Sequence, residues 1–342
     1  MKQDKRFAQM DPFRSAIRGN DHDRIPVWFM RQAGRYLPSY MKYRQRMNIE
    51  EMMSSPDIIV EVTHDPVERI GVDAAIIFAD ITTPLNGMGI RIRFQDSLGP
   101  ITENNIERSG VSVLEEFDAS SFDHPVLRAI SQYKERYPEP LIGFAGGPVT
   151  ILSYIISDSV DRDLFRVKRM MITDEQAYRT VMRRLTDMVI AFARMQIMRG
   201  VDAFQIFDSW AGYLSPGEYE RFVKPYMHEI LQEISDSVPS IYFSTMTSSY
   251  IADMDLPADF YSIDWRVDMH RFSSVLPHEI GIQGNLDPAV VNYDYAIGEA
   301  RRIIESVSGR QRYIFNTGHG LMPSTDPEKL KRLVEYVHSV NP

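Results

Sequence analysis

Two arginines stand four residues apart directly after an apolar segment. Arg31 and Arg35 follow the run Pro26–Met30 and flank Gln32-Ala33-Gly34. A guanidinium group presents a planar fork of donors that fits a carboxylate or a phosphate, and side chains four apart can share one helical face. Gly34 permits close approach of the backbone. Two solvated surface arginines are the simpler alternative, but the position after an apolar strand favours an anion-binding site.

An acidic residue, Asp80, follows a second apolar run, Ala74–Ala79. A carboxylate at this position can cap a following helix, accept hydrogen bonds from ring N–H groups, or act as a base. The pattern of residues alone does not favour one of these uses over the others.

A histidine bracketed by glycines, His319, follows the last apolar run. Its neutral ring can both donate and accept near neutral pH. The other seven histidines form no close pair with zinc-ligand spacing. Tyr154 is a weaker candidate because tyrosine occurs 17 times in this chain. Ser209 lacks the Gly-x-Ser-x-Gly flanks of a hydrolase, so it is weaker too.

Short apolar runs rich in β-branched and aromatic residues recur along the chain, as expected of strands buried on both faces. Segments with a helical period separate them, and Asp174–Arg199, Pro216–Val238 and Asp326–Val340 are predicted helices. The eight runs are Pro26–Met30, Asp73–Phe78, Leu141–Ala145, Ala203–Phe207, Ser240–Ser244, Phe260–Ile263, Glu279–Gln283 and Arg312–Phe315.

Eight strand-and-helix units in 342 residues predict an α/β fold, and specifically a (β/α)8 TIM barrel. We expect this barrel to be a single domain that spans residues 1–342, with a flexible N-terminal stretch of about ten residues. A doubly wound sheet is the rival, but its Gly-x-Gly-x-x-Gly turn is missing. The long link 79–140 predicts a loop insertion at the C-terminal face. Within it, a hairpin from Ile90–Phe94 through Asp96–Gly99 toward Ile101 would help to wall a pocket. The candidate residues follow strand ends, where barrels of this kind place their active sites.

The composition excludes several classes of function. The formal net charge is -9, with no basic run that would indicate a nucleic acid or an anionic membrane as partner. Cysteine is absent, which excludes disulfides, thiolate nucleophiles and Cys-ligated metals. The N-terminus lacks the apolar core of a signal peptide and no run is long enough to span a bilayer, so we expect a cytoplasmic protein.

One string is highly specific: Met30–Pro38, Met-Arg-Gln-Ala-Gly-Arg-Tyr-Leu-Pro, resembles the signature of the uroporphyrinogen decarboxylase family. The resemblance continues in order from about Arg24 to the C-terminus, so it covers nearly the whole chain. The further matching segments are Phe78–Ile81, Gly143–Gly146 with Pro148, Phe207–Gly212, Gln283–Pro288 and Asn316–Gly320.

The resemblance implies a single (β/α)8 barrel that decarboxylates the four acetate side chains of uroporphyrinogen III to coproporphyrinogen III in haem biosynthesis. It implies no metal or organic cofactor and a homodimer with facing clefts. Asp80, Arg31 and Arg35 would be catalytic, with Asp80 accepting hydrogen bonds from the pyrrole N–H groups and Arg31 a candidate proton donor. The residues implied to bind the tetrapyrrole are Arg31, Gln32, Ala33, Gly34, Arg35, Asp80, Tyr154, Ser209 and His319.

A reaction without a cofactor is chemically reasonable, because a pyrrole protonated on its ring can itself accept the electrons that remain when carbon dioxide leaves. An arginine is an awkward general acid, since its pKa exceeds ~12. A related barrel methyltransferase would hold zinc with cysteines, so the lack of cysteine counts against it. A non-catalytic tetrapyrrole-binding protein is the other alternative. Departures from the family pattern fall at Ser39, Val149, Ser157 and Thr245.

Overall fold

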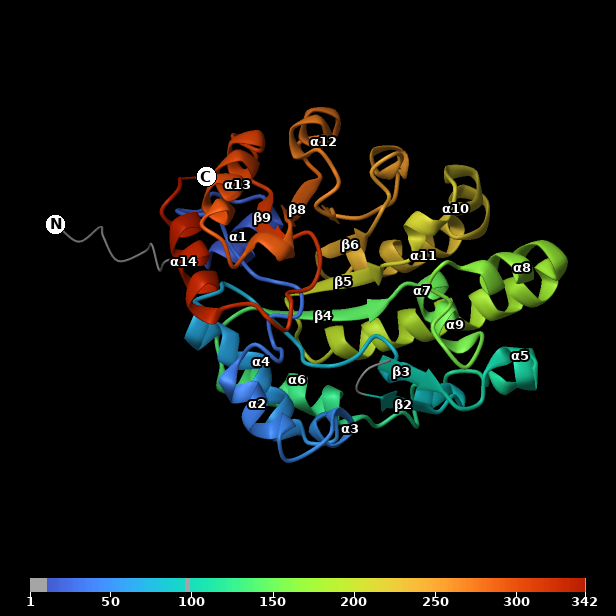
Figure 1. Cartoon of the computed structure of the whole chain (residues 1–342). Coiled ribbons are helices and arrows are strands. Elements are labelled where there is room, and N and C mark those ends of the chain that lie inside the picture. The colour runs from blue at the N-terminus through green and yellow to red at the C-terminus, as the bar shows by residue number, and fades with distance from the viewer. Residues whose placement is uncertain (1–10, 96–98, 342) are drawn as a thin grey trace.

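The computed structural model describes residues 11–95 and 99–341, in which seven strands form one parallel sheet (Figure 1). The strand order is β1-β4-β5-β6-β7-β8-β9. The expected flexible N-terminus lies outside the described residues. The strands are β1 Ala75–Ile76, β4 Leu141–Gly146, β5 Ala203–Asp208, β6 Ser240–Ser244, β7 Phe260–Ser262, β8 Gly281–Leu286 and β9 Tyr313–Thr317.

Helices connect successive strands, which confirms the α/β class (Figure 1). Apolar residues on both faces of the strands are buried, because helices cover the outer face and side chains fill the inner one. The helices are α1 Pro12–Arg18, α2 Pro38–Arg44, α3 Ile49–Met53, α4 Pro56–Ile70, α5 Ile106–Ser109, α6 Pro125–Arg136, α7 Pro148–Ile155, α8 Phe165–Thr173, α9 Glu175–Ile197, α10 Pro216–Phe222, α11 Lys224–Ser235, α12 Met269–Val275, α13 Tyr295–Ser306 and α14 Pro327–His338.

The first of the eight apolar runs, Pro26–Met30, does not form a strand, so that part of the prediction was wrong. It makes an isolated parallel bridge between Val27 and Phe315 of β9. Phe315 donates its backbone N–H to Pro26 O at 2.9 Å, and Asp73, just before β1, donates its own to Val27 O at 2.7 Å. The run is therefore hydrogen-bonded to both edges of the seven-stranded sheet.

Side chains explain why this run forms no ladder. Three of its backbone N–H groups donate to side-chain oxygens, so these groups are not available to a neighbouring strand. The pairs are Val27 with Asp73 Oδ2 at 2.8 Å, Phe29 with Gln32 Oε1 at 3.0 Å and Met30 with Asn316 Oδ1 at 3.2 Å.

Hydrogen bonds across the inner face show how strongly the sheet curls. Gln283 on β8 donates to Gln205 Oε1 on β5 at 2.9 Å and to Ser262 Oγ on β7 at 2.8 Å. Trp28, in the first run, donates to Gln283 Oε1 at 2.8 Å. Because β5 and β8 are separated by two strands in the sheet order, their side chains can meet only if the sheet bends round on itself.

Two connections bear on the predicted elements. The predicted hairpin is present as β2 Ile92–Gln95 paired antiparallel with β3 Gly99–Thr102, and residues 96–98 of its turn lie outside the described residues. The segment Pro216–Val238 was predicted as one helix but forms two, α10 and α11, that break at Val223. Pro225 lacks an N–H and its ring would clash with the carbonyl four residues earlier, which ends the first helix.

Candidate active site at the carboxyl ends of the strands

The arginine-bearing loop lies between the first apolar run and α2. Arg31 and Arg35 are both exposed, and the loop is not helical, so the expectation of one helical face was wrong. Arg31 has a φ of 60°, which a non-glycine residue rarely adopts. A Cβ on Gly34 would lie 3.2 Å from Arg31 O, so the close backbone approach expected at this glycine is present.

Gln32 and Ala33 hold this loop to the body of the protein. The Gln32 side chain is buried; it donates to Ala74 O at 3.0 Å and accepts from the Phe29 N–H. Tyr36 donates its hydroxyl to Gln32 O at 2.6 Å, and Ala33 packs partly buried on the core. The Gln32 side chain therefore anchors the loop, because its amide both donates to and accepts from the backbone.

Asp80 lies just before a 3₁₀ helix, Thr83–Met88, but the N-cap of this helix is Thr82 and no side chain caps it, so the capping use left open by the sequence is not realised. Its Oδ1 accepts from the backbone N–H of Thr82 at 2.9 Å and from the Thr82 hydroxyl at 2.6 Å. In the described part of the chain, both hydrogen bonds to this carboxylate go to Oδ1. Oδ2 therefore remains as an acceptor for a ligand.

Electrostatics connect Asp80 to two other predicted residues. Burial raises the pKa of Asp80, while the hydrogen bonds from Thr82 and the nearby positive charge of Arg31 oppose that rise. Tyr154, on α7, has its pKa raised to about 12 by burial and by the charge of Asp80. Tyr154 is therefore a neutral hydroxyl at physiological pH and can donate to a carboxylate.

His319 lies between two close packing contacts that explain its glycine neighbours. A Cβ on Gly318 would lie 2.2 Å from Trp265 N, and one on Gly320 would lie 2.4 Å from Arg31 Cδ. The backbone contact leaves room only for glycine at position 318, whereas a side chain at position 320 would require Arg31 to move. Burial, followed by the charge of Arg31, lowers the pKa of His319 to about 4, so its ring is neutral near pH 7.

Ser209 follows a buried polar network at the end of β5. Asp208 accepts from Thr150 Oγ1 at 3.0 Å and from Tyr242 OH at 3.1 Å, and burial raises its pKa to about 6. Ser209 itself is half-buried, and its carbonyl accepts from Thr245 Oγ1 at 2.6 Å. This network fixes the turn that carries Ser209.

The structure thus brings three predicted residues within electrostatic reach of a fourth, Arg31. Arg31 influences the pKa of Asp80, of Tyr154 and of His319. Arg35 and Ser209 stand at the same end of the molecule, but in the described residues neither side chain forms a hydrogen bond or ion pair with those four.

Three aromatic residues at this end were not singled out from the sequence. Phe144, Phe207 and Phe243 point inward from β4, β5 and β6, with Phe207 ring centroids 5.5 and 5.7 Å from the other two. The Phe243 ring lies 6.2 Å from that of His319. Each phenylalanine stands one to two residues before its strand ends, and that inward-facing position was the signal that could have found it.

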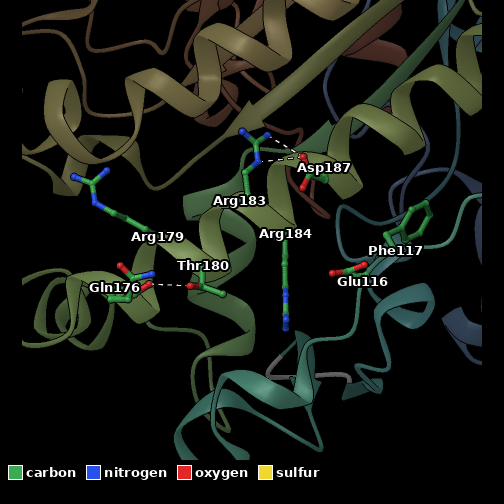
Figure 2. A pocket seen from close by; sticks show the side chains of 8 residues that line it. All are labelled: Glu116, Phe117, Gln176, Arg179, Thr180, Arg183, Arg184 and Asp187. Atoms are coloured by element: carbon green, nitrogen blue, oxygen red, sulfur yellow. Dashed lines mark hydrogen bonds and ion pairs between the residues drawn. The ribbon is translucent and has the colours of Figure 1, made fainter.

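Two cavities flank this region. One of about 260 Å³ is lined by Asp80, by Thr82 and Thr83, and by hairpin residues Ile92 and Phe94, so the insertion helps to wall a pocket as expected. Another, of about 500 Å³, lies beside α9, and none of the predicted site residues lines it (Figure 2).

Within residues 11–95 and 99–341, no three His, Asp or Glu side chains group so that they could hold a metal ion. Across the same ranges, no helix is both long enough and apolar enough to cross a membrane.

Comparison with known proteins places this site in context. A protein-family model described as uroporphyrinogen decarboxylase (URO-D) matches residues 8–340. Uroporphyrinogen decarboxylase of Thermoplasma acidophilum is 81% identical over 332 residues, 97% of this chain and 100% of the relative. That of Picrophilus torridus is 45% identical over 335 residues, 97% and 100% of the two chains. A solved methyltransferase from Methanosarcina mazei shares the fold, with a TM-score of 0.78 at 18% identity and 96% and 97% coverage.

Proposed function

Because the chain belongs to the uroporphyrinogen decarboxylase family, as its motifs predicted, we propose that it decarboxylates the four acetate side chains of uroporphyrinogen III. The product is coproporphyrinogen III, an intermediate of haem biosynthesis, and the enzyme is a carboxy-lyase. The observation that carries the proposal is the position of Arg31, whose charge acts on Asp80, Tyr154 and His319 together.

Each turn of the reaction exchanges one carboxylate for one proton. Protonation of a pyrrole ring makes the ring an electron acceptor, the bond from the methylene carbon to the carboxylate breaks, and carbon dioxide leaves. A second protonation at the methylene carbon and loss of the ring proton give a methyl group. The ring carries positive charge after each protonation and is neutral once carbon dioxide has left, and a carboxylate at the pyrrole N–H groups stabilises both cations.

We assign this stabilising role to Asp80, whose carboxylate is held by Thr82 through one oxygen only. Arg31 and Arg35 would bind substrate carboxylates through their guanidinium groups and hold the macrocycle in register. Tyr154, Ser209 and His319 would orient further carboxylates as neutral hydrogen-bonding groups. Gln32, Ala33 and Gly34 would shape the loop that presents the two arginines. The inward-facing phenylalanines would form an apolar floor beneath the macrocycle.

The assay is direct. Purified protein is incubated anaerobically with uroporphyrinogen III, and the products are oxidised and separated by chromatography. Porphyrins with seven, six, five and finally four carboxyl groups are expected, and their absence would refute the proposal. Tight binding of tetrapyrrole without these products would instead support a non-catalytic binding protein. The methyltransferase alternative is not favoured, because the relatives that match over the whole chain are decarboxylases.

We extend the proposal to architecture and assembly. The seven-stranded sheet and the run Pro26–Met30 together would close a (β/α)8 barrel, supported by the hydrogen bonds that this run makes to both edges. The chain would act as one domain and as a homodimer in the cytoplasm. Light scattering coupled to size exclusion tests the dimer, since a monomer at assay concentration would exclude it, and cell fractionation tests the compartment.

A further inference from the structure

Arg266 stands at the site but has no role in the family motif. It follows β7, and its side chain is 44% exposed, while its neighbour Asp264 is 1% exposed. We propose that Arg266 is a carboxylate-binding residue, which with Arg31 flanks His319 and determines how tightly one carboxylate of the substrate is held. This inference rests on the proposed function and adds a specificity residue to it.

The histidine loop packs against both arginine-bearing segments. Gly320, which follows His319, packs against the Arg31 side chain. Gly318, which precedes His319, packs against the backbone of Trp265, the residue before Arg266. The charges of Arg31 and Arg266 both lower the pKa of His319. A ligand group held at His319 therefore meets two positive charges, which suits an anion.

Stacking holds the Arg266 side chain in place. Its guanidinium carbon lies 4.0 Å from the centroid of the Trp265 ring, a distance at which the ring face attracts a cation. The Trp265 ring in turn lies 6.2 Å from the His319 ring, nearly perpendicular at 87°. The arginine is thus ordered next to the histidine before any ligand arrives, which lowers the entropic cost of binding.

Asp264 is the carboxylate that pairs with Arg266 within the described residues, and it does not depend on the guanidinium for all its hydrogen bonds. It accepts from the backbone N–H of Met246 at 2.5 Å and from that of Arg266 at 2.8 Å. Arg266 Nη1 adds a single contact at 3.1 Å. A guanidinium has five donors, so Arg266 can bind a ligand carboxylate while Asp264 stays satisfied by the backbone.

The test compares Arg266→Gln and Arg266→Lys with Arg271→Gln, a nearby exposed arginine on α12. KM and kcat are measured anaerobically with uroporphyrinogen III. We expect Arg266→Gln to raise KM about tenfold, with kcat changed less than about twofold, because a charge-assisted contact is lost. Arg266→Lys should fall between, since lysine keeps the charge but not the fork. Arg271→Gln should match the wild type.

The product separates the two kinds of substrate carboxylate. Coproporphyrinogen III keeps the four propionates and has no acetates. If Arg266 binds a propionate, the Kd of this product should be higher for Arg266→Gln than for the wild type. If Arg266 binds an acetate, the two Kd values should be equal. An unchanged KM in Arg266→Gln, or the same change in Arg271→Gln, would overturn the proposal. So would a fall in kcat and thermal midpoint with KM unaltered, because that pattern indicates a structural role.

A failure of the proposed function would be recognised separately. If the wild type shows no decarboxylation, the binding of uroporphyrin III, which requires no turnover, still compares the variants. A Kd that rises in Arg266→Gln alone would support the arginine as a carboxylate-binding residue, and equal Kd values in all variants would refute it.

Discussion

Two arginine-rich regions of this protein use the same side chain in opposite ways. On α9, the long helix beside the cavity in Figure 2, Arg179, Arg183 and Arg184 all have protein partners. At the carboxyl ends of the strands, Arg31 and Arg35 are exposed, and within the described residues neither forms an ion pair with a carboxylate. The difference lies in whether the charge is already neutralised.

The partners on α9 belong to the protein itself. Arg179 Nε donates to Glu175 at 2.9 Å, Arg183 forms two parallel hydrogen bonds with Glu229 at 2.7 and 2.9 Å, and Arg184 donates to the carbonyl of Leu114. The charges of Arg179 and Arg183 are thus paired with carboxylates of the protein, and Arg184 joins α9 to the segment that contains Leu114. Arginine count alone therefore says little about function.

The contrast also resolves an apparent conflict of charge. Arginine supplies 30 of the 38 basic residues, yet the net charge is -9, and the proposed substrate carries eight carboxylates. Net charge describes the whole surface, whereas binding depends on the field in one region. Arg31 and Arg35, which form no ion pair within the described residues, can supply that field in an acidic protein, and Arg31 does so next to the neutral His319.

The largest effect is expected at Asp80. Asp80→Asn keeps an oxygen that can accept from Thr82 but removes the negative charge proposed to stabilise the protonated pyrrole. We expect kcat to fall about 100-fold or more, with the thermal midpoint nearly unchanged. Anaerobic steady-state kinetics and thermal unfolding measure the two quantities.

Asp287→Asn is the matched control for Asp80→Asn. Asp287 also follows a strand and precedes a 3₁₀ helix, and its carboxylate accepts from Ala289 N at 2.9 Å. Asp187→Asn on α9 removes a carboxylate that pairs with Arg183. Both should keep near-normal kcat. If either lost as much activity as Asp80→Asn, the special role assigned to the charge of Asp80 would be refuted.

Arg31→Gln should have the next largest effect. It removes a guanidinium without an ion-pair partner, and we expect kcat/KM to fall roughly 10- to 100-fold. The same change should raise the pKa of His319, because the charge of Arg31 now lowers it. NMR titration of the histidine ring measures that shift. An unaltered His319 pKa would contradict the proximity on which the site is built.

His319 provides a smaller effect that depends on pH. Its pKa is about 4 in the folded protein and near ~6.5 when unfolded, so the unfolded chain binds the proton first as pH falls. The stability due to neutral His319 is complete above pH ~6.5 and is lost as pH falls toward ~4. Between pH 7 and pH 5, the free energy of unfolding should therefore fall by about 1–2 kcal/mol less in His319→Gln than in the wild type.

Denaturant unfolding at both pH values measures this difference, with exposed His278→Gln as control. Asp208 titrates in the same range with the opposite sign, because burial raises its pKa to about 6 and protonation then favours the folded state. The comparison of variant with wild type cancels that contribution. Equal pH dependence in His319→Gln and the wild type would show that the ring is not held neutral.

The sequence predicted most of the fold because buried parallel strands are continuous apolar runs. Seven of the eight predicted runs are strands. The run Pro26–Met30 is equally apolar but forms no strand, because the side chains of Asp73, Gln32 and Asn316 accept hydrogen bonds from its backbone N–H groups. Two of those side chains are more than 40 residues away along the chain, so no local pattern could reveal them.

The sequence predicted where the site lies, but not the contacts that hold its residues in place. Strand ends located Asp80 and His319, since parallel strands bring their carboxyl ends together. The role of Gln32 as an anchor depends on Ala74 O, and the need for Gly318 depends on the backbone of Trp265. Such contacts arise only when separate loops pack, and a single sequence does not encode them in any readable spacing.

The smallest effect is expected on α9, where Arg183→Gln removes the pair with Glu229 and the contact with Asp187. The side chain of Arg183 is 43% exposed and that of Glu229 is 45% exposed, so water already screens their attraction. We expect a loss below about 1 kcal/mol, shrinking further at high salt, with KM and kcat unchanged. Thermal unfolding at two salt concentrations and the anaerobic assay measure this. A rise in KM would mean that the α9 cavity binds substrate, and the distinction between the two arginine regions would fail.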